Sequence, residues 1–282
     1  MLDGSNRNRA IEWLRASCAA IRRCGAAGTL LLLMLAALLM ANACRADTVM
    51  ITGANSGLGL EFARQYAAAG WTVIAIHRHD STPDSLVDLH KQYRNVRPER
   101  MDVTDENQVH ALSEKLRDVP IDVLINNAAY TDIGPDQRFG QLDYDVGRAV
   151  LATNVLGPLL VSEAFLPQVE KGTQKKIVSI TSTHASLTEP TPGSGGIFYR
   201  ASKAGLNRAM IVVTDDLRAK GIAVVLIHPG SVRMSRDEPA TSIYGKRIMV
   251  DVTVGAMIKT IEHLSMADSG HFLLFDGSPL AW

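Results

Sequence analysis

Tyr199 and Lys203 stand four residues apart, and together they could move a proton. In a helix, side chains at this spacing lie on one face, so a phenol and an ammonium group would be neighbours. A nearby cation favours the phenolate and lowers the tyrosine pKa from its usual value of about 10. Such a tyrosine can protonate a carbonyl oxygen or deprotonate an alcohol. Because this spacing is also common on exposed helices, the interpretation depends on the other motifs.

Two further polar residues could take part in the same chemistry. Ser182 lies two residues beyond an apolar run, and its hydroxyl could donate a hydrogen bond to a substrate oxygen that gains negative charge. Ser186 competes for this role, but we favour Ser182. Asn154 lies inside an expected helix, where asparagine is unfavourable, so it serves either the site or a helix kink.

A glycine-rich segment follows the first apolar run, residues 47–51, and precedes a helical pattern at 60–69. It reads Thr52-Gly53-Ala54-Asn55-Ser56-Gly57-Leu58-Gly59. Glycines allow a tight turn that can approach a pyrophosphate, and the following helix N-terminus offers free N–H groups. The spacing G-x-x-x-G-x-G differs from the G-x-G-x-x-G of most dinucleotide folds. The strand before and the helix after it nevertheless indicate a dinucleotide-binding turn.

Short apolar runs alternate with helical patterns beyond residue 46, and these elements must position the polar residues. Strands are expected at 47–51, 72–76, 95–101, 123–126, 177–180, 223–227 and 272–275, and helices at 60–69, 106–117, 143–169, 199–218 and 253–264. This alternation predicts an α/β fold: a single domain with a Rossmann-type, doubly wound parallel sheet of about seven strands. Ligands bind at the carboxyl ends of such strands, where the motifs also fall.

The ordered motifs resemble those of the short-chain dehydrogenases/reductases over about residues 47–282. They are Thr52-Gly53…Gly57-Leu58-Gly59, Asp102-Val103, Asn126-Asn127-Ala128-Ala129, Asn154, the Ser182 region, Tyr199…Lys203 and Pro229-Gly230. The ending from Phe275 to Trp282 is most similar to the single-domain carbonyl-reductase branch, which includes C-factor-like and sniffer-like proteins. Two residues depart from the family pattern: Ala129 replaces a usual glycine, and Met234 a frequent threonine. Residues 234–247 are expected to form a lid over the substrate.

The resemblance implies a catalytic group of Asn154, Ser182, Tyr199 and Lys203. Asn154 would hold a water that links Lys203 to solvent, and Lys203 would also bind the nicotinamide ribose. The implied cofactor-binding residues are Gly53, Asn55, Ser56, Gly57, Leu58, Gly59, Arg78, Asp102, Val103, Asn126, Ala128, Tyr199, Lys203, Pro229, Gly230 and Val232. Asp102 and Val103 would flank the adenine, and Asn126 would combine structural and cofactor-supporting roles.

The choice of cofactor depends on the residues that follow the second strand. An acid there would bind the ribose diol of NAD, whereas an arginine accommodates the 2′-phosphate of NADP. His77 occupies the position of the acid, and Arg78 follows it. We therefore predict NADP in preference to NAD, with Asp80 as an alternative contact for the ribose.

Composition narrows the function further. The chain has 29 basic and 29 acidic residues and a pI near 7.1, so no nucleic-acid partner is indicated. Its three cysteines, Cys18, Cys24 and Cys44, all precede the predicted domain, and its histidines lack metal-ligand spacing, so no metal is expected. The expected partner is a small carbonyl or alcohol substrate, and family analogy adds a homo-oligomer.

Residues 1–46 form a separate extension with two interpretations. Several arginines precede an apolar run at 26–41, and small residues follow at 41–43, as in a secretory signal or a signal anchor. The protein would then be exported or membrane-anchored through residues 26–43. Alternatively, Met34 or Met40 is the true start, and the protein is cytoplasmic. The apolar run is short for a spanning helix.

Three functional hypotheses follow. The leading one is an NADP-dependent oxidoreductase acting on a small carbonyl or alcohol, with Tyr199 as general acid and base. A regulatory or signalling protein that binds NADP with little catalysis is the alternative, motivated by Ala129, Met234 and the unusual N-terminus. A membrane-tethered reductase of a lipid-soluble substrate requires that residues 26–43 remain in the mature chain.

Overall fold

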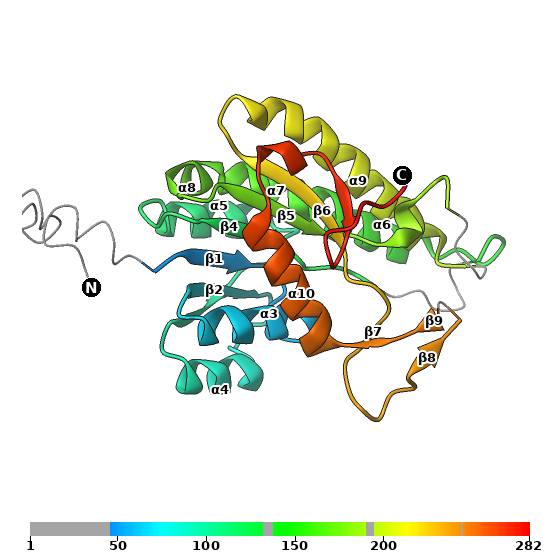
Figure 1. The fold of residues 1–282 in the computed structure, drawn as a ribbon, viewed down its shortest axis with the longest axis horizontal. Helices are drawn as coiled ribbons and strands as arrows, with labels where there is room; N and C mark the ends of the chain where they lie inside the picture. Colours follow the sequence, from blue (N-terminus) through cyan, green and yellow to red (C-terminus); the bar gives the residue numbers. More distant parts are fainter. Residues whose placement is uncertain (1–45, 132–137, 190–194, 244) are drawn as a thin grey trace, which may run out of the picture. The chain divides into compact units, whose positions relative to one another are not determined.

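The computed structural model describes residues 46–131, 138–189, 195–243 and 245–282 (Figure 1). Its centre is a seven-stranded sheet in the order β11-β6-β5-β4-β1-β2-β3, with every neighbouring pair parallel. The strands are β1 (Thr48–Ile51), β2 (Thr72–His77), β3 (Val96–Arg100), β4 (Val123–Asn126), β5 (Lys176–Ile180), β6 (Ala223–His228) and β11 (Phe272–Leu274). The predicted Rossmann-type sheet is therefore confirmed, with each strand end within one residue of its expected position.

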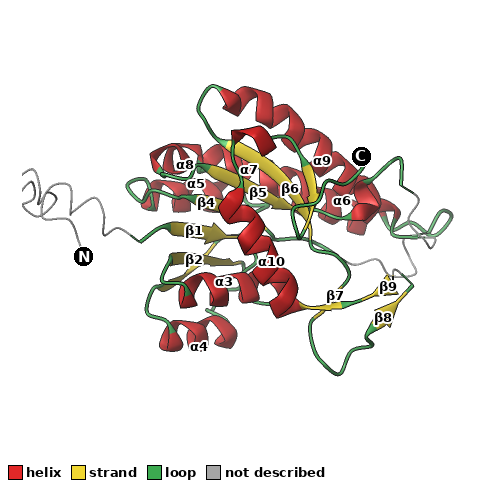
Figure 2. Cartoon of the chain, in the orientation of Figure 1, coloured by secondary structure: helices red, strands yellow, loops and turns green. Residues whose placement is uncertain are grey.

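Helices cover both faces of the sheet, as a parallel sheet requires (Figure 2). One core packs α3 (Gly57–Ala68), α4 (Asp84–Gln92) and α10 (Val250–His263) against the sheet. The other core contains side chains of α5 (Glu106–Lys115), α7 (Gly157–Ala164) and α9 (Ile197–Arg218). Successive strand residues supply opposite cores: Val49 and Ile51 belong to the first and Met50 to the second.

The structure corrects the expected helices at two places. Helix α4, between β2 and β3, was not predicted; it begins after Pro83 and buries only Leu86 and Leu89, so its apolar signal is weak. The single helix expected at 143–169 is instead divided into four pieces. These are α6 (Tyr144–Leu151), the π-helix η2 (Ala152–Leu156), α7, and α8 (Leu166–Lys171).

A short excursion follows β6 before α10 begins. Strand β7 (Val232–Arg233) pairs in parallel with β10 (Ile248–Met249), and β8 (Thr241–Ser242) pairs with β9 (Gly245–Lys246) in an antiparallel hairpin. Figure 1 shows this excursion beside α10. It corresponds to the expected lid, although Tyr244 lies outside the described residues.

Residues 47–282 form one compact unit. The apolar run at 26–41 lies outside the described residues, so both interpretations of the extension remain predictions. Within the described ranges, no helix has the length and apolar character needed to cross a membrane.

Candidate active and cofactor site

A cavity of about 410 Å³ opens where the carboxyl ends of the strands meet the glycine-rich turn. Most residues predicted for the site line it: Gly53, Asn55, Ser56, Gly57, Leu58, Arg78, Asp102, Val103, Ala128, Tyr199, Lys203 and Pro229. These residues come from separate parts of the chain, and the sheet order brings them together. Six predicted residues do not line this cavity: Gly59, Asn126, Asn154, Ser182, Gly230 and Val232.

The turn between β1 and α3 is shaped by its glycines. Gly53 and Gly57 have φ angles of 65° and 55°, a region that favours glycine. A Cβ atom at Gly59 would lie 2.2 Å from the carbonyl oxygen of Gly53, so only glycine lets the helix approach its own turn this closely. Gly59 therefore maintains the turn from outside the cavity.

This turn also fits the pyrophosphate of a dinucleotide. Ser56 occupies the N-cap position of α3, and its side chain makes no capping hydrogen bond. The first N–H groups of α3 consequently remain available to an anion at the positive end of the helix dipole. Met234 closes this end of the cavity, because its sulfur lies 3.8 Å from the position a Cβ atom would take at Gly57.

At the end of β2, His77 and His79 line the cavity together with Arg78. His77 is buried, whereas Arg78 is exposed. Asp80, the alternative ribose contact, instead forms an ion pair with Arg100 at 2.7 Å and does not line the cavity. The two histidines were not predicted as cofactor contacts, although their positions on either side of Arg78 were a usable signal.

Helix α9 presents Tyr199 and Lys203 to the cavity, as their spacing predicted. Lys203 is 4% exposed, and its Nζ donates a hydrogen bond to the carbonyl oxygen of Ile180 at 2.9 Å. The same Nζ lies 5.8 Å from the centre of the Tyr199 ring. Burial lowers the pKa of Lys203 to about 8. The ammonium group is thus held beside the phenol by a main-chain carbonyl.

Ser182 and Ser186 have different surroundings, which bears on the choice between them. Ser182 is buried at the start of a short 3₁₀ turn, and its Oγ accepts a hydrogen bond from the main chain of His184 at 3.2 Å. Ser186 Oγ accepts one from the main chain of Glu189 at 3.0 Å, in a local turn. The His184 ring meets the Tyr199 ring edge-on, with centres 6.0 Å apart. The choice of Ser182 over Ser186 stays a prediction, while His184 is a neighbour of the tyrosine.

His184 is held neutral by its surroundings. Burial, assisted by the charge of Arg200, lowers its pKa to about 4. His228, at the end of β6, has its pKa lowered to about 4 by burial and by the charges of His184 and Lys203. Both imidazoles are consequently uncharged at neutral pH.

Asn154 is buried in the π-helix η2, a helix type often found at functional sites. Its Oδ1 accepts a hydrogen bond from Tyr130 N at 2.7 Å, and its Nδ2 donates to Tyr130 O and to Ser202 Oγ, both at 3.0 Å. The side chain thus connects the segment after β4 with α9 directly beside Lys203. The predicted contact with water remains a prediction.

Two adjacent asparagines at the end of β4 have different surroundings. Asn126 is buried and donates to Ser162 Oγ at 2.9 Å, which places its side chain between the sheet and α7 rather than in the cavity. Asn127 lines the cavity instead, and its Nδ2 donates to Thr52 O at 2.9 Å. Asn127 was not among the predicted site residues. Ala129, the departure from the family pattern, also lines the cavity.

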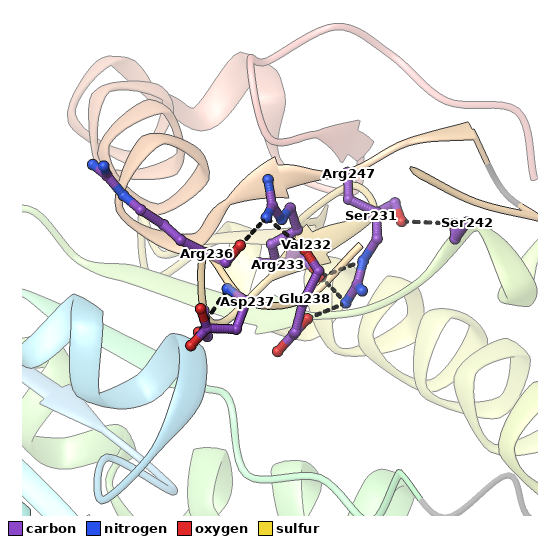
Figure 3. A network of polar contacts seen from close by, with 9 residues as sticks. Ser231, Val232, Arg233, Arg236, Asp237, Glu238, Ser242 and Arg247 are labelled. Atoms are coloured by element: carbon purple, nitrogen blue, oxygen red, sulfur yellow. Dashed lines mark hydrogen bonds and ion pairs between the residues drawn. The ribbon is translucent and has the colours of Figure 1, made fainter. Parts of the chain in front are cut away.

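The expected lid is held by the polar contacts drawn in Figure 3. Arg233 donates to the carbonyl oxygens of Arg236 and Glu238. Arg247 donates to Val232 O and to Glu238 Oε2, both at 2.6 Å. Ser235, the residue after Met234, hydrogen-bonds Asp237 and does not line the cavity.

The C-terminal segment fastens the loop that follows Ser182. Thr188 N donates to the main-chain oxygen of Trp282 at 2.9 Å, and the Trp282 ring packs against Phe272 of β11 with centres 5.4 Å apart. Leu280 N also donates to Phe272 O at 2.8 Å. The loop is therefore anchored to β5 at one end and to the β11 region at the other.

The sheet order, the glycine-rich turn and the cavity at the strand ends define a dinucleotide-binding Rossmann protein. A family model described as short chain dehydrogenase matches residues 47–242. The chain belongs to the short-chain dehydrogenase/reductase family, which makes it an oxidoreductase by class.

Two curated proteins illustrate its relationships. The chain is 33% identical to 1-hydroxy-2-glutathionyl-2-methyl-3-butene dehydrogenase of Rhodococcus sp. (strain AD45), covering 84% of this chain and 100% of that protein. It is 34% identical to the C-signal protein of Myxococcus xanthus, covering 58% of this chain and 93% of that protein.

Solved structures agree with this relationship. NADPH-bound carbonyl reductase from chicken fatty liver matches with a TM-score of 0.76 at 30% identity, over 84% of this chain and all of that one. Carbonyl reductase Sniffer of D. melanogaster matches with a TM-score of 0.73 at 26% identity, over the same shares. The expected likeness to C-factor-like and sniffer-like proteins is confirmed.

Proposed function

We propose that this protein is an NADP-dependent oxidoreductase that interconverts a small carbonyl compound and its alcohol. The observation that carries the proposal is one cavity with Tyr199 and the buried Lys203 on its wall and Arg78 beside the glycine-rich turn. Two similar proteins, a dehydrogenase and an NADPH-bound carbonyl reductase, support the same chemistry.

We assign a role to each predicted catalytic residue. Tyr199 donates a proton to the carbonyl oxygen, and the Lys203 ammonium stabilises the phenolate that remains. Ser182 orients the substrate oxygen, and Asn154 positions α9 through Ser202. The nicotinamide, when bound, supplies or accepts the hydride.

The preference for NADP rests on charge at the end of β2. His77 stands where an acid would bind the ribose diol, Arg78 is exposed on the cavity wall, and Asp80 is engaged by Arg100. A planar guanidinium group is well suited to a phosphate because it offers several donors in a fixed fork. The 2′-phosphate of NADP would therefore lie near the Arg78 cation, and the Asp80 carboxylate, paired with Arg100, would not repel it.

Arg78→Ala tests this assignment. We expect the Kd of NADPH to rise by roughly 10- to 100-fold, because a charge-assisted contact to phosphate is lost, while the Kd of NADH stays within about twofold. Fluorescence titration of the purified protein with both cofactors measures this. Arg94→Ala, an exposed arginine that does not line the cavity, is the matched control.

Tighter binding of NADH than of NADPH by the unmodified protein would contradict the NADP assignment. Absence of binding by either cofactor would overturn the proposed function and favour a degenerate site. An equal loss of affinity for NADPH and NADH in Arg78→Ala would mean that Arg78 supports the cavity without selecting the phosphate.

The reduction rate should also depend on the protonation of Lys203. Burial lowers the pKa of this ammonium to about 8, so it is charged below that pH and loses its proton above it. Because carbonyl reduction consumes a proton and requires the ammonium, kcat/KM should fall by about tenfold per pH unit above that pKa. Initial rates between about pH 6 and about pH 10 with one aldehyde check this. A flat profile across the range would contradict it.

A further inference from the structure

One corner of the cavity carries three consecutive basic side chains, His77, Arg78 and His79. His77 is 3% exposed, and its Nδ1 is buried without a hydrogen-bond partner. The His77 and His79 rings are stacked, with centres 6.5 Å apart and planes inclined by 23°. Since buried polar atoms are almost always paired in proteins, an unpaired imidazole nitrogen beside a binding cavity points to a ligand.

Two parts of the chain build this corner together. Asn55, in the glycine-rich turn, places its Nδ2 3.4 Å from His79 Nε2. Ser85 of α4 donates to Asn55 O at 2.7 Å, which holds the turn against the segment after β2. The histidines therefore lie beside the turn predicted to hold the pyrophosphate, where the adenosine half of a dinucleotide would extend.

Burial and the neighbouring positive charges favour the neutral form of His77. Burial is the main cause that lowers the pKa of His77; the charges of His79 and Arg100 lower it further, and Glu99 and the His79 main chain raise it. Arg78 adds positive charge nearby, Asp80 is paired with Arg100, and Asp102 on the cavity wall accepts hydrogen bonds from Thr104. A phosphate dianion would introduce the negative charge that a protonated imidazole requires.

We propose that His77 and His79 act with Arg78 as a proton-linked reader of the NADP 2′-phosphate, taking up a proton from the buffer as the phosphate docks. This inference rests on the proposed function and adds to it two residues and a linkage. A histidine at the position of the ribose-binding acid would then select the phosphorylated cofactor rather than merely fail to bind NAD.

The sign of the linkage follows from the charges. If the bound form holds one more proton than the free form, NADPH affinity rises as pH falls through the imidazole range. The phosphate sets the lower limit, because its own second pKa is about 6. Contact with cations lowers that phosphate pKa and releases protons, so an observed uptake has to come from the protein.

Calorimetric titration of the full chain with NADPH and with NADH, at about pH 7.5 in two buffers of different ionisation enthalpy, counts the protons taken up. We expect the protein to take up more protons when it binds NADPH than when it binds NADH. His77→Asn and His79→Asn should each reduce this excess and raise the Kd of NADPH by roughly 5- to 10-fold, with that of NADH nearly unchanged. His110→Asn, on the exposed side of α5 and outside the cavity, is the control.

The possible outcomes distinguish failure of this inference from failure of the proposed function on which it rests. Failure of both cofactors to bind the unmodified protein would overturn the proposed function itself. Tight NADPH binding without excess proton uptake, or with an uptake that both variants retain, would overturn only the histidine reader. Should His77→Asn lower the melting temperature strongly, His77→Gln and the exposed His79→Asn decide the question.

Discussion

Replacing Tyr199 by phenylalanine should lower kcat for carbonyl reduction by about 100- to 10,000-fold, the range that a positioned proton donor contributes. The change removes one hydroxyl and keeps the ring that meets His184, so the cavity wall keeps its shape. The Kd of NADPH should therefore stay within about threefold of the wild-type value, since most of the binding contacts lie elsewhere. Steady-state rates and a parallel cofactor titration measure the two effects separately.

Tyr144→Phe provides the matched control for that experiment. Tyr144 is exposed on α6, packs edge-on against Phe198, and does not line the cavity. Its hydroxyl should be dispensable for turnover. Normal activity of Tyr199→Phe would disprove the proton-donor assignment, and loss of NADPH binding in that variant would mean that the tyrosine acts mainly through the cofactor.

Gly59→Ala should destabilise the protein by about 2–4 kcal/mol, a large effect for one methyl group. The added Cβ would lie 2.2 Å from Gly53 O and 2.6 Å from Asn127 Nδ2. The first of these is a main-chain atom of the turn itself, so relief requires α3 to move away from β1. NADPH affinity should fall as well, because the same turn forms the expected pyrophosphate site.

Urea unfolding compares this variant with Gly205→Ala, a second helical glycine. A Cβ atom at Gly205 would lie 3.5 Å from Val155, an ordinary contact, so alanine there should be neutral or stabilise by up to about 1 kcal/mol. Wild-type stability of Gly59→Ala would contradict the close approach seen at the turn.

The strands could be predicted from the sequence because each is buried on both faces and so appears as a short apolar run. Val123 to Ile125, for example, are all fully buried between β1 and β5. Helix α4 was missed because it lies at the edge of the sheet, where two leucines suffice to attach it. The π-helix at Asn154 was also missed, because a change in hydrogen-bond register leaves the composition unaltered.

Residues that line the cavity were predictable where backbone conformation requires a particular residue type. They were less predictable where lining the cavity depends on the direction of a side chain. The glycines of the first turn are required by backbone geometry, and the sequence predicted this turn from their spacing. Asn126 and Asn127 are adjacent, but neighbouring residues at a strand end point to opposite faces. One amide consequently enters the core beside Ser162 while the other holds Thr52. The pairing of Asp80 with Arg100 depends on β2 and β3 lying side by side, which local sequence does not encode.

The residue of the C-terminal segment that contacts the loop after Ser182 is a tryptophan, so the protein carries an intrinsic fluorescent probe of this loop. The tryptophans among the described residues are Trp71, which packs on Tyr66, and Trp282, whose main-chain oxygen accepts a hydrogen bond from Thr188 N. Trp282 is 41% exposed, so its emission is sensitive to how closely solvent approaches the loop. A tyrosine at position 71 would leave Trp282 as the emitter of this part of the chain. Movements of the loop that follows Ser182 could then be followed by stopped-flow fluorescence without any attached dye.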